Sequence, residues 1–324
     1  MRIAVAGSIA TDHLMTFQGR FAEQIIPDQI QRLSLSFLID ELDVRRGGVA
    51  ANICFGMGVL GLGPVLVGAA GADFEEYRAW LDRHGVDTSA VRISELRHTA
   101  RFICTTDLDQ NQIASFYAGA MAEARNIELK PIADRLGGLD LVLIGADDPD
   151  AMVRHSEECR TLGTPFAADP SQQLARMEGP RVRGLIEGAD LLFCNDYEKA
   201  LAEQKTGWSE AEVLDRVGTR ITTLGAKGVR IDRVGEPAVH VPAAVVVGDP
   251  VDPTGVGDAF RAGFLAAHSW GLPLERAAQV GNATAVHCLE ADGPQEYRMT
   301  AESLLDRLER SYGAEAAREI APFV

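Results

Sequence analysis

Short apolar runs alternate with segments of helix length along most of this chain of 324 residues. Such a run fits a strand that is buried on both faces, and the segment that follows can fold back as a helix to cover it. The runs expected to be strands are Ile3–Gly7, Val65–Gly71, Leu139–Ala146, Pro165–Asp169, Leu191–Asn195 and Arg220–Leu224. The expected helices are Val49–Leu60, Phe74–His84, Ala151–Leu162, Tyr197–Lys205, Glu210–Val217, Leu274–Leu289 and a covering helix at Thr300–Ala316. This pattern predicts a doubly wound α/β fold, with a mostly parallel sheet and helices on both faces.

Two segments leave this alternation and return to it. Residues 33–40 nearly alternate between apolar and polar side chains, and Thr99–Thr106 and Gln112–Tyr117 flank a turn-rich stretch, as the arms of a β-hairpin do. We therefore expect a small β-sheet apart from the main one. The expected organisation is one domain over residues 1–324, with a lid over the strand ends formed by about 13–46 and 97–118.

The charge of the chain restricts its partners. With 47 Asp and Glu against 31 Lys and Arg, the formal net charge is −16 at pH 7. Nucleic acids and anionic membranes are bound by clustered Lys and Arg, so we expect neither as a partner. The five cysteines show no C-x-x-C spacing, and the sequence contains neither a secretory leader pattern nor an apolar run long enough to span a membrane. These features predict a cytoplasmic protein.

The segment Asp252–Phe260 combines a candidate anion site with a candidate base. Gly255 and Gly257 bracket Val256, and glycines let consecutive backbone N–H groups turn toward one point at the start of the helix expected there. A carboxylate next to a bound phosphate is repelled unless it takes a proton, and Asp258 lies at that position. The segment predicts phosphoryl transfer to a hydroxyl. A glycine turn with Asp258 as an ordinary first-turn residue is the alternative.

A second group of candidates suits the recognition of hydroxyl groups. Asp12, shortly after Ser8, could accept hydrogen bonds from two adjacent hydroxyls of a diol, with loop capping as the alternative. Gly47 and Gly48 begin an expected helix, and Asn52 lies about one turn later, so backbone and amide can face one ligand. We interpret this second pattern as hydroxyl recognition, with close packing of the helix on the sheet as the alternative.

A third group of candidates follows two later strands. Asn195 and Glu198 share one face of a first helical turn, where Asn195 suits the N-cap and Glu198 could hold Mg²⁺ through water. Thr223, Gly225 and Gly228 belong to a glycine-containing turn that suits either a hairpin or the approach of a nucleotide.

The motifs of other phosphate-binding proteins are missing from the sequence. It contains no G-x-x-x-x-G-K-[ST] P-loop, no G-x-G-x-x-G after the first strand, and no H-R-D or D-F-G set. The sequence therefore lacks the signatures of P-loop nucleoside triphosphatases, Rossmann dehydrogenases and protein kinases.

Taken together, these residues resemble the ribokinase-like (PfkB) family of sugar and nucleoside kinases, over essentially the whole chain. Two signatures carry the resemblance, namely Gly47-Gly48 to Asn52 and the Asp-x-Thr-Gly-x-Gly-Asp pattern from Asp252 to Asp258. Asn195-x-x-Glu198 and Thr223-x-Gly225 lie between them in the expected order. The chain departs from the family at Pro253, Val256 and Asp169-Pro170-Ser171, which we expect to adjust the pocket without abolishing activity.

The resemblance implies a role for each matching residue. Asp258 would be the base on the acceptor hydroxyl, and the backbone of Gly255, Val256 and Gly257 would form the anion hole. The implied substrate-binding residues are Ser8, Asp12, Ser36, Gly48, Asn52, Phe102, Phe116, Gln173 and Arg176. The implied ATP-binding residues are Asn195, Thr223, Gly225, Gly228 and Asn282, with Mg²⁺ held through water by Glu198. A monovalent cation is a further candidate cofactor, and we expect a homodimer formed through the lid.

Within that family, four segments are most similar to the bacterial adenosine kinases: Gly7–Asp12, Leu35–Phe37, Thr99–Tyr117 and Gln172–Arg176. A purine needs a flat apolar slot, which lid aromatics Phe102 and Phe116 could supply by stacking, unless both are core of the lid sheet. We therefore expect an ATP-dependent kinase that phosphorylates the 5′-hydroxyl of adenosine, as in purine salvage. A ribokinase- or fructokinase-like sugar kinase and a non-catalytic nucleoside- or sugar-binding regulator are the alternatives.

Overall fold

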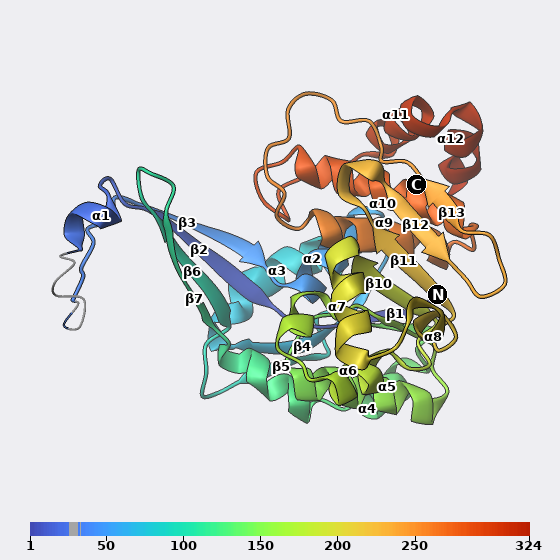
Figure 1. Cartoon of the computed structure of the whole chain (residues 1–324), viewed down its shortest axis with the longest axis horizontal. Coiled ribbons are helices and arrows are strands. Elements are labelled where there is room, and N and C mark those ends of the chain that lie inside the picture. The colour runs from blue at the N-terminus through green and yellow to red at the C-terminus, as the bar shows by residue number, and fades with distance from the viewer. Residues whose placement is uncertain (26–31, 33) are drawn as a thin grey trace.

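The computed structural model describes residues 1–25, 32 and 34–324, which form an α/β body and a smaller sheet that projects from it (Figure 1). Within these residues, the main sheet has nine strands in the order β13-β12-β11-β10-β9-β8-β1-β4-β5. They are β1 (Ile3–Ala6), β4 (Val65–Gly71), β5 (Val91–Ser94), β8 (Leu141–Ile144), β9 (Phe166–Ala168), β10 (Leu191–Asn195), β11 (Thr219–Thr223), β12 (Val229–Asp232) and β13 (Val239–Val241). The pairs from β11 to β5 in this order are parallel, and β12 and β13 pair antiparallel at one edge. The mostly parallel sheet expected from the sequence is confirmed.

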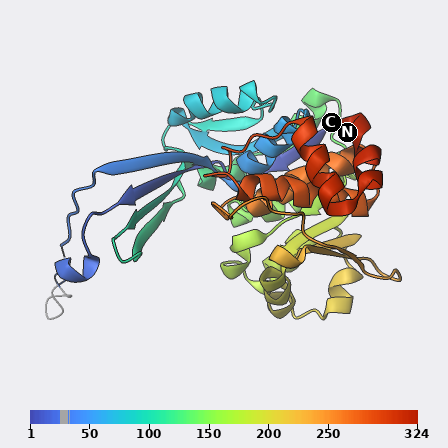
Figure 2. The ribbon, with the colours of Figure 1, turned by 90° about the horizontal axis from the view of Figure 1, so that it is seen from above.

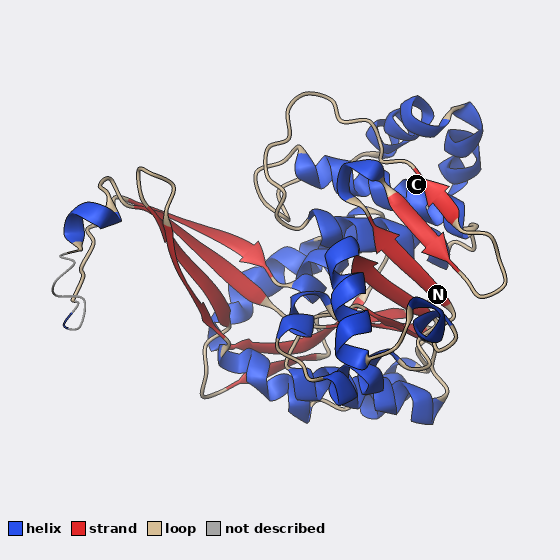
Figure 3. Ribbon diagram, in the orientation of Figure 1, coloured by secondary structure: helices blue, strands red, loops and turns tan. Residues whose placement is uncertain are grey.

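Helices cover both faces of the main sheet (Figure 3). One face carries α2 (Val49–Val59), α3 (Glu75–Arg83), α9 (Val256–Ser269), α10 (Leu274–Leu289), α11 (Ala301–Tyr312) and α12 (Ala314–Ile320). The other carries α4 (Leu129–Leu136), α5 (Pro149–Leu162), α6 (Gly179–Ile186), α7 (Asp196–Thr206) and α8 (Glu210–Leu214). In β1, Ile3 and Val5 face the first group and Ala4 and Ala6 the second, and all four are at most 2% exposed. Burial on both faces requires an apolar residue at every position, which explains the apolar runs.

Some elements differ from the sequence expectation. Helices α4 and α6 were not predicted, and the covering helix expected over Thr300–Ala316 is divided into α11 and α12. The division falls at Gly313, whose φ of 88° lies in the left-handed region and ends α11. In the described part of the chain, the helices are too short or too polar to cross a membrane.

The second sheet, here called the small sheet, has the strand order β3-β2-β6-β7 within the described residues. It consists of β2 (Ala10–Thr16), β3 (Glu41–Gly47), β6 (Ala100–Thr106) and β7 (Gln112–Tyr117). Strands β6 and β7 form the predicted hairpin. Seen from above in Figure 2, the small sheet extends away from the body, with α1 (Phe21–Gln24) at its far end.

The alternating segment at residues 33–40 does not form a strand. Leu33 lies outside the described residues, and residues 34–39 have no regular structure; the strand begins afterwards, at Glu41. Alternation still governs burial, because Leu35, Phe37 and Ile39 are partly covered while the residues between them are exposed. Phe37 packs against Phe17 and Phe21, with ring centroids 4.8 and 5.0 Å apart, so side-chain contacts at the end of the small sheet replace strand pairing.

Candidate active site

The glycine motif forms the amino-terminal end of α9. Gly255 has φ of 76°, and a Cβ at this position would lie 2.3 Å from Cβ of Pro294, so the turn requires glycine. The N–H groups of Val256 and Gly257 lie in the first turn of α9, where no carbonyl four residues earlier in the helix can accept from them. The Val256 N–H makes a long contact, 3.4 Å, with the Pro253 carbonyl, which is weak enough for a bound anion to replace. With the helix dipole, these N–H groups can bind an anion.

Asp258 lies in this first turn and is held by Asn52. The Asn52 side chain on α2 donates from Nδ2 to Oδ2 of Asp258 over 2.8 Å. The α2 helix begins close to the first strand because Gly48 has φ of 96°, and a Cβ there would lie 2.6 Å from the Ser8 carbonyl oxygen. Oγ of Ser8 accepts from the Val49 N–H at 3.0 Å, which caps the start of α2. These contacts join the two signatures of the sequence into one site.

A cavity of about 520 Å³ opens beside Asp258, between the body and the small sheet. The predicted site residues that line it are Ser8, Asp12, Gly48, Asn52, Phe102, Phe116, Gln173, Arg176, Gly255 and Asp258. Ala10, Val49, Met121, Ala146, Ser171, Gln172 and Thr254 line it as well, and these were not predicted. The cavity therefore gathers residues from distant parts of the sequence around one carboxylate.

One row of the small sheet crosses all four strands on the cavity side. Arg45, Asp12, Phe102 and Phe116 are direct partners in the strand registers. The two phenylalanines lie opposite one another, as the hairpin predicted. Phe116 is 44% exposed, so it is not a core residue of the small sheet. The rings are available to a ligand in the cavity.

Burial raises the pKa of Asp258 to about 7. The hydrogen bond from Asn52 and the charge of Arg261 oppose this rise, and the carboxylates of Asp169 and Glu198 add to it. Burial also raises the pKa of Asp12 to about 6, against the opposing charge of Arg45. A carboxyl group that titrates near neutral pH is suited to take a proton from a hydroxyl.

A second cluster of predicted residues lies at the ends of β10 and β11, where Asn195 and Thr223 are direct neighbours in the parallel register. Oδ1 of Asn195 accepts from the Glu198 N–H, and Oε2 of Glu198 accepts from the Asn195 N–H, each at 2.8 Å, which makes a capping box at the start of α7. Helix capping is therefore part of the role of both residues.

The glycines of the next turn have structural roles of their own. The turn joins β11 and β12 as an antiparallel hairpin, which confirms the hairpin interpretation, and the approach of a nucleotide to this turn stays a prediction. A Cβ at Gly228 would lie 2.1 Å from the Val241 carbonyl oxygen, and Gly225 has φ of 58°. Asn282 on α10 donates from Nδ2 to the Pro242 carbonyl at 2.9 Å, tying α10 to the segment after β13.

Glu198 suits a magnesium ion that keeps most of its water. Its Oε2 accepts from a backbone N–H, which leaves Oε1 as an oxygen donor of the kind that Mg²⁺ prefers. Within the described residues, no three His, Cys, Asp or Glu side chains are grouped so that they could hold a metal ion. The residues therefore fit an ion bound mainly by water and phosphate rather than by a protein cage.

The structure does not bring Ser36 to the cavity. This residue is exposed and lies next to Phe37, in the aromatic contacts at the far end of the small sheet. Arg261 and its partner Asp169 lie close to Asp258, and neither was among the predicted site residues. A lone arginine in the apolar run after Asp258 was the available signal.

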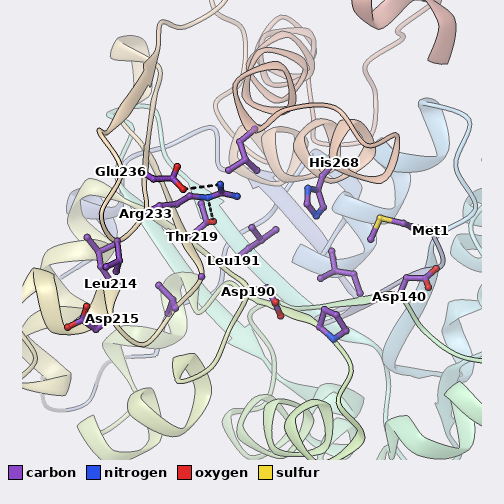
Figure 4. A pocket seen from close by; sticks show the side chains of 16 residues that line it. Met1, Asp140, Asp190, Leu191, Leu214, Asp215, Thr219, Arg233, Glu236 and His268 are labelled. Atoms are coloured by element: carbon purple, nitrogen blue, oxygen red, sulfur yellow. Dashed lines mark hydrogen bonds and ion pairs between the residues drawn. The ribbon is translucent and has the colours of Figure 1, made fainter.

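A larger cavity, of about 770 Å³, lies at the amino-terminal ends of central strands of the main sheet, away from the strand ends that carry the predicted residues (Figure 4). Leu141, Leu191 and Thr219, the first residues of β8, β10 and β11, line it together with Asp190, Arg233, Glu236 and His268. None of the predicted site residues lines this cavity, so the smaller cavity beside Asp258 is the candidate active site although this one is larger.

Comparisons with known proteins find relatives that match most of this chain. The model of the pfkB family of carbohydrate kinases matches residues 10–301. A nucleoside kinase of Methanocaldococcus jannaschii is 32% identical over 267 residues, which cover 82% of this chain and 85% of the relative. The structure of Burkholderia thailandensis nucleoside kinase in ligand-free form matches with a TM-score of 0.85 and 36% identity, over 95% of this chain and 100% of that one. The same enzyme in complex with ADP-inosine matches with a TM-score of 0.81 and 36% identity, over 96% of each chain. The chain thus belongs to the pfkB family of carbohydrate kinases.

Proposed function

We propose that this protein is an ATP-dependent kinase that phosphorylates the 5′-hydroxyl of a nucleoside, with adenosine as the expected acceptor and AMP and ADP as products. The observation that carries the proposal is the position of Asp258. It lies in the first turn of α9, next to backbone N–H groups that can bind a phosphoryl group, and it lines a cavity together with the half-buried ring of Phe102 and the exposed ring of Phe116. The nucleoside kinases of M. jannaschii and B. thailandensis support a nucleoside acceptor.

In the proposed reaction, each residue of the site acts on a named atom of the hydroxyl or the phosphoryl group. A carboxylate oxygen of Asp258 accepts the proton of the 5′-hydroxyl as the hydroxyl oxygen bonds to the γ-phosphorus of ATP and the bond to the β,γ-bridging oxygen breaks. The N–H groups of Val256 and Gly257 donate to the oxygens of the transferred group, where negative charge develops. A Mg²⁺ ion near Glu198 would neutralise charge on the phosphates when bound.

ATP binding on the other side of the phosphoryl group is assigned to the cluster at β10 and β11. Asn195, Thr223, Gly225 and Gly228 lie at the ends of neighbouring strands, where ligands of doubly wound sheets bind, and Asn282 supports this region from α10. The ADP in the complex of B. thailandensis nucleoside kinase supports a nucleotide site. A monovalent cation is a further candidate cofactor.

Inosine is a second candidate acceptor, and the end of the cavity near Gln173 favours its inclusion. Nε2 of Gln173 donates to the Asp147 carbonyl at 2.8 Å, which leaves Oε1 as a buried acceptor without a partner. The guanidinium of Arg176, which also lines the cavity, can only donate. Adenine and hypoxanthine each carry a hydrogen-bond donor beside a hydrogen-bond acceptor on the edge that holds N1 and position 6. The base donor can bond to Oε1 of Gln173 and the base acceptor to the guanidinium of Arg176, so this pair of side chains can bind either base. The inosine complex of the B. thailandensis enzyme agrees with this proposal.

The small sheet is proposed to act as a lid on a single domain and as a dimer interface. Its outer face exposes Leu42, Val44 and Ile113, which are 57%, 52% and 45% exposed. Two copies could cover these residues in a homodimer. Light scattering on the purified protein tests this, because Val44→Glu should shift a dimer to the monomer mass. The five buried free cysteines fit the proposed cytoplasmic location.

A coupled assay of ATP consumption against adenosine, inosine, ribose and fructose tests the function. We expect turnover of the two nucleosides with formation of the 5′-monophosphate, identified by chromatography. Faster turnover of ribose or fructose would establish the sugar-kinase alternative. Binding of a nucleoside without any ATP consumption would establish the non-catalytic alternative.

A further inference from the structure

A chain of hydrogen bonds runs from the indole of Trp80 to the carboxylate of Asp258. The indole Nε1 donates to Oε1 of Gln295 at 3.1 Å, and Nε2 of Gln295 donates to Oδ1 of Asn52 at 2.9 Å. Nδ2 of Asn52 then donates to Oδ2 of Asp258 at 2.8 Å. Gln295, in the loop after α10, is only 1% exposed, so its amide cannot exchange these partners for water.

The two ends of the chain fix the direction of every bond in it. An indole N–H can only donate, so the atom of Gln295 that faces Trp80 must be the oxygen. The other atom of this amide is then the nitrogen, which can only donate, so Asn52 must turn its oxygen toward Gln295 and its nitrogen toward Asp258. An ionised carboxylate can only accept, which is the partner that this orientation requires.

A side branch through Tyr77 enforces the same orientation. The Tyr77 hydroxyl donates to the Gly47 carbonyl at 2.9 Å, and Nε2 of Gln295 donates to the hydroxyl oxygen. Burial raises the pKa of Tyr77 far above its usual range, so the hydroxyl keeps its proton. Because a carbonyl can only accept, the hydroxyl must accept from Gln295, which again requires the amide nitrogen at that position.

Packing holds Trp80 at the start of this chain. Its ring stacks on Phe55 with centroids 6.0 Å apart, and the guanidinium of Arg46 lies 4.3 Å from its ring centroid. Tyr77 and Trp80 share one face of α3 at a spacing of three residues. The orientation of Asn52 therefore depends on a helix that does not touch the substrate cavity.

We propose that Gln295 and Trp80 are positioning residues that fix the side-chain amide of Asn52, so that it always presents its N–H to Asp258. The inference rests on the proposed role of Asp258 as the base. A reversed amide would present its oxygen to the carboxylate and would disfavour the ionised form that takes the proton. The network thus keeps the base ionised at a lower pH than burial alone would allow.

The test replaces the positioning residues without changing any charge. Trp80→Phe keeps a ring on Phe55 but removes the donor, and Gln295→Met keeps an unbranched side chain but removes both amide functions. The matched control is Trp270→Phe, which removes an indole that packs on Phe323 and lies outside the network. The charged and titratable groups that face Asp258 are Arg261 on α9, Asp169 after β9, Glu198 on α7, Cys288 on α10 and Tyr297, and all of them stay in place.

The primary measurement is the titration of the Asp258 carboxyl group by ¹³C NMR, assigned with Asp258→Asn. The wild type should titrate near pH 7. The midpoint should rise by about half to one pH unit in Gln295→Met, because the carboxylate loses a fixed hydrogen bond, and by less in Trp80→Phe. Trp270→Phe should titrate like the wild type. The acidic limb of kcat/KM, measured with whichever acceptor the enzyme uses, should move in parallel, with little change in the KM for ATP.

Two outcomes would overturn the inference. Wild-type midpoints in both Trp80→Phe and Gln295→Met would show that the network does not control the amide of Asn52. A shift of equal size in Trp270→Phe would show a general loss of packing. If the wild type phosphorylates sugars but no nucleoside, the proposed acceptor is wrong, and the NMR titration still decides the inference.

Discussion

Arg261 and Asp169 form a buried ion pair close to Asp258. Nη2 of Arg261 donates to Oδ1 of Asp169 at 2.8 Å, and Nε donates to the second carboxylate oxygen. Their side chains are only 6% and 1% exposed. Nη1 of Arg261 also donates to the Gly257 carbonyl, so the pair joins the first turn of α9 to the segment just before the short 3-10 helix that carries Gln173. Pro170 and Ser171, where the chain departs from the family pattern, therefore follow an aspartate whose ion pair with Arg261 is intact.

Replacing Arg261 by glutamine should destabilise the fold. The substitution leaves Asp169 buried without its partner, which costs about 3–5 kcal/mol of unfolding free energy. Urea denaturation followed by circular dichroism measures the change. Arg310→Gln, at an exposed ion pair with Asp306, is the control and should change stability by less than about 0.5 kcal/mol. Equal effects in the two variants would show that the buried pair has no special role.

Asp258→Asn should lower kcat by about 10²–10⁴-fold, because the amide keeps the shape of the side chain but cannot accept the proton. Nucleoside binding, measured by isothermal titration calorimetry, should largely survive. A variant with near wild-type turnover would remove Asp258 from the mechanism.

Asp147→Asn should change how stability depends on pH. Burial raises the pKa of Asp147 to about 8, and its Oδ2 has no partner. In the wild type, the unfolded chain ionises at this residue above about pH 4 while the folded protein keeps the proton until about pH 8, so stability falls by about 1.4 kcal/mol per pH unit between these values. Asparagine cannot ionise and still accepts from the Asp148 N–H through its side-chain oxygen, so the variant should gain stability relative to the wild type as pH rises from 4 to 8. Urea unfolding at several pH values gives the difference. Asp249→Asn, at an exposed carboxyl, should show no such trend. A stability difference between Asp147→Asn and the wild type that does not change with pH would contradict the raised pKa.

Glu198→Gln should raise the Mg²⁺ concentration needed for half-maximal rate, because a neutral amide replaces the carboxylate near the ion. The capping contact can persist, since glutamine also accepts from the Asn195 N–H. Glu212→Gln, in the equivalent capping box with Ser209 on α8, is the matched control. Identical Mg²⁺ titrations for the wild type and Glu198→Gln would limit Glu198 to helix capping. Acceptor preference should be the same in all three proteins.

Phe102→Ala and Phe116→Ala should each weaken nucleoside binding by about 1–3 kcal/mol, the range for stacking of a base on an aromatic ring. Calorimetric titration with adenosine and inosine measures the loss. Tyr117→Ala, adjacent to Phe116 but on the opposite face of the small sheet and 43% exposed, should bind like the wild type. Phosphorylation of a free sugar should barely respond to either phenylalanine substitution. Variants that lose only stability would assign both rings to packing.

The sequence predicted the elements whose local pattern reflects burial directly. The strand Val65–Gly71 has the predicted bounds because both of its faces are covered, so every position is apolar. The hairpin placed Phe102 opposite Phe116 because a short connection leaves little freedom in the register. Residues 34–39 alternate in the same way but form no strand. An alternating pattern shows only that one side of a segment is buried, and the packing of Phe37 on other aromatic rings buries that side without a strand. Ser36, next to Phe37, therefore lies away from the cavity.

The sequence by itself determined the α/β class, the hairpin and the positions of Asp258, Asn52 and the glycines of the two signatures. Only the tertiary structure decided how these residues act on one another. Asn52 contacts Asp258 across 206 positions of the chain and Gln295 across 243, and Arg261 meets Asp169 across 92. Local periodicity reports whether a side chain is buried. The partner that satisfies a buried polar group depends on how distant helices and loops pack together, and one sequence carries no local signal for that choice.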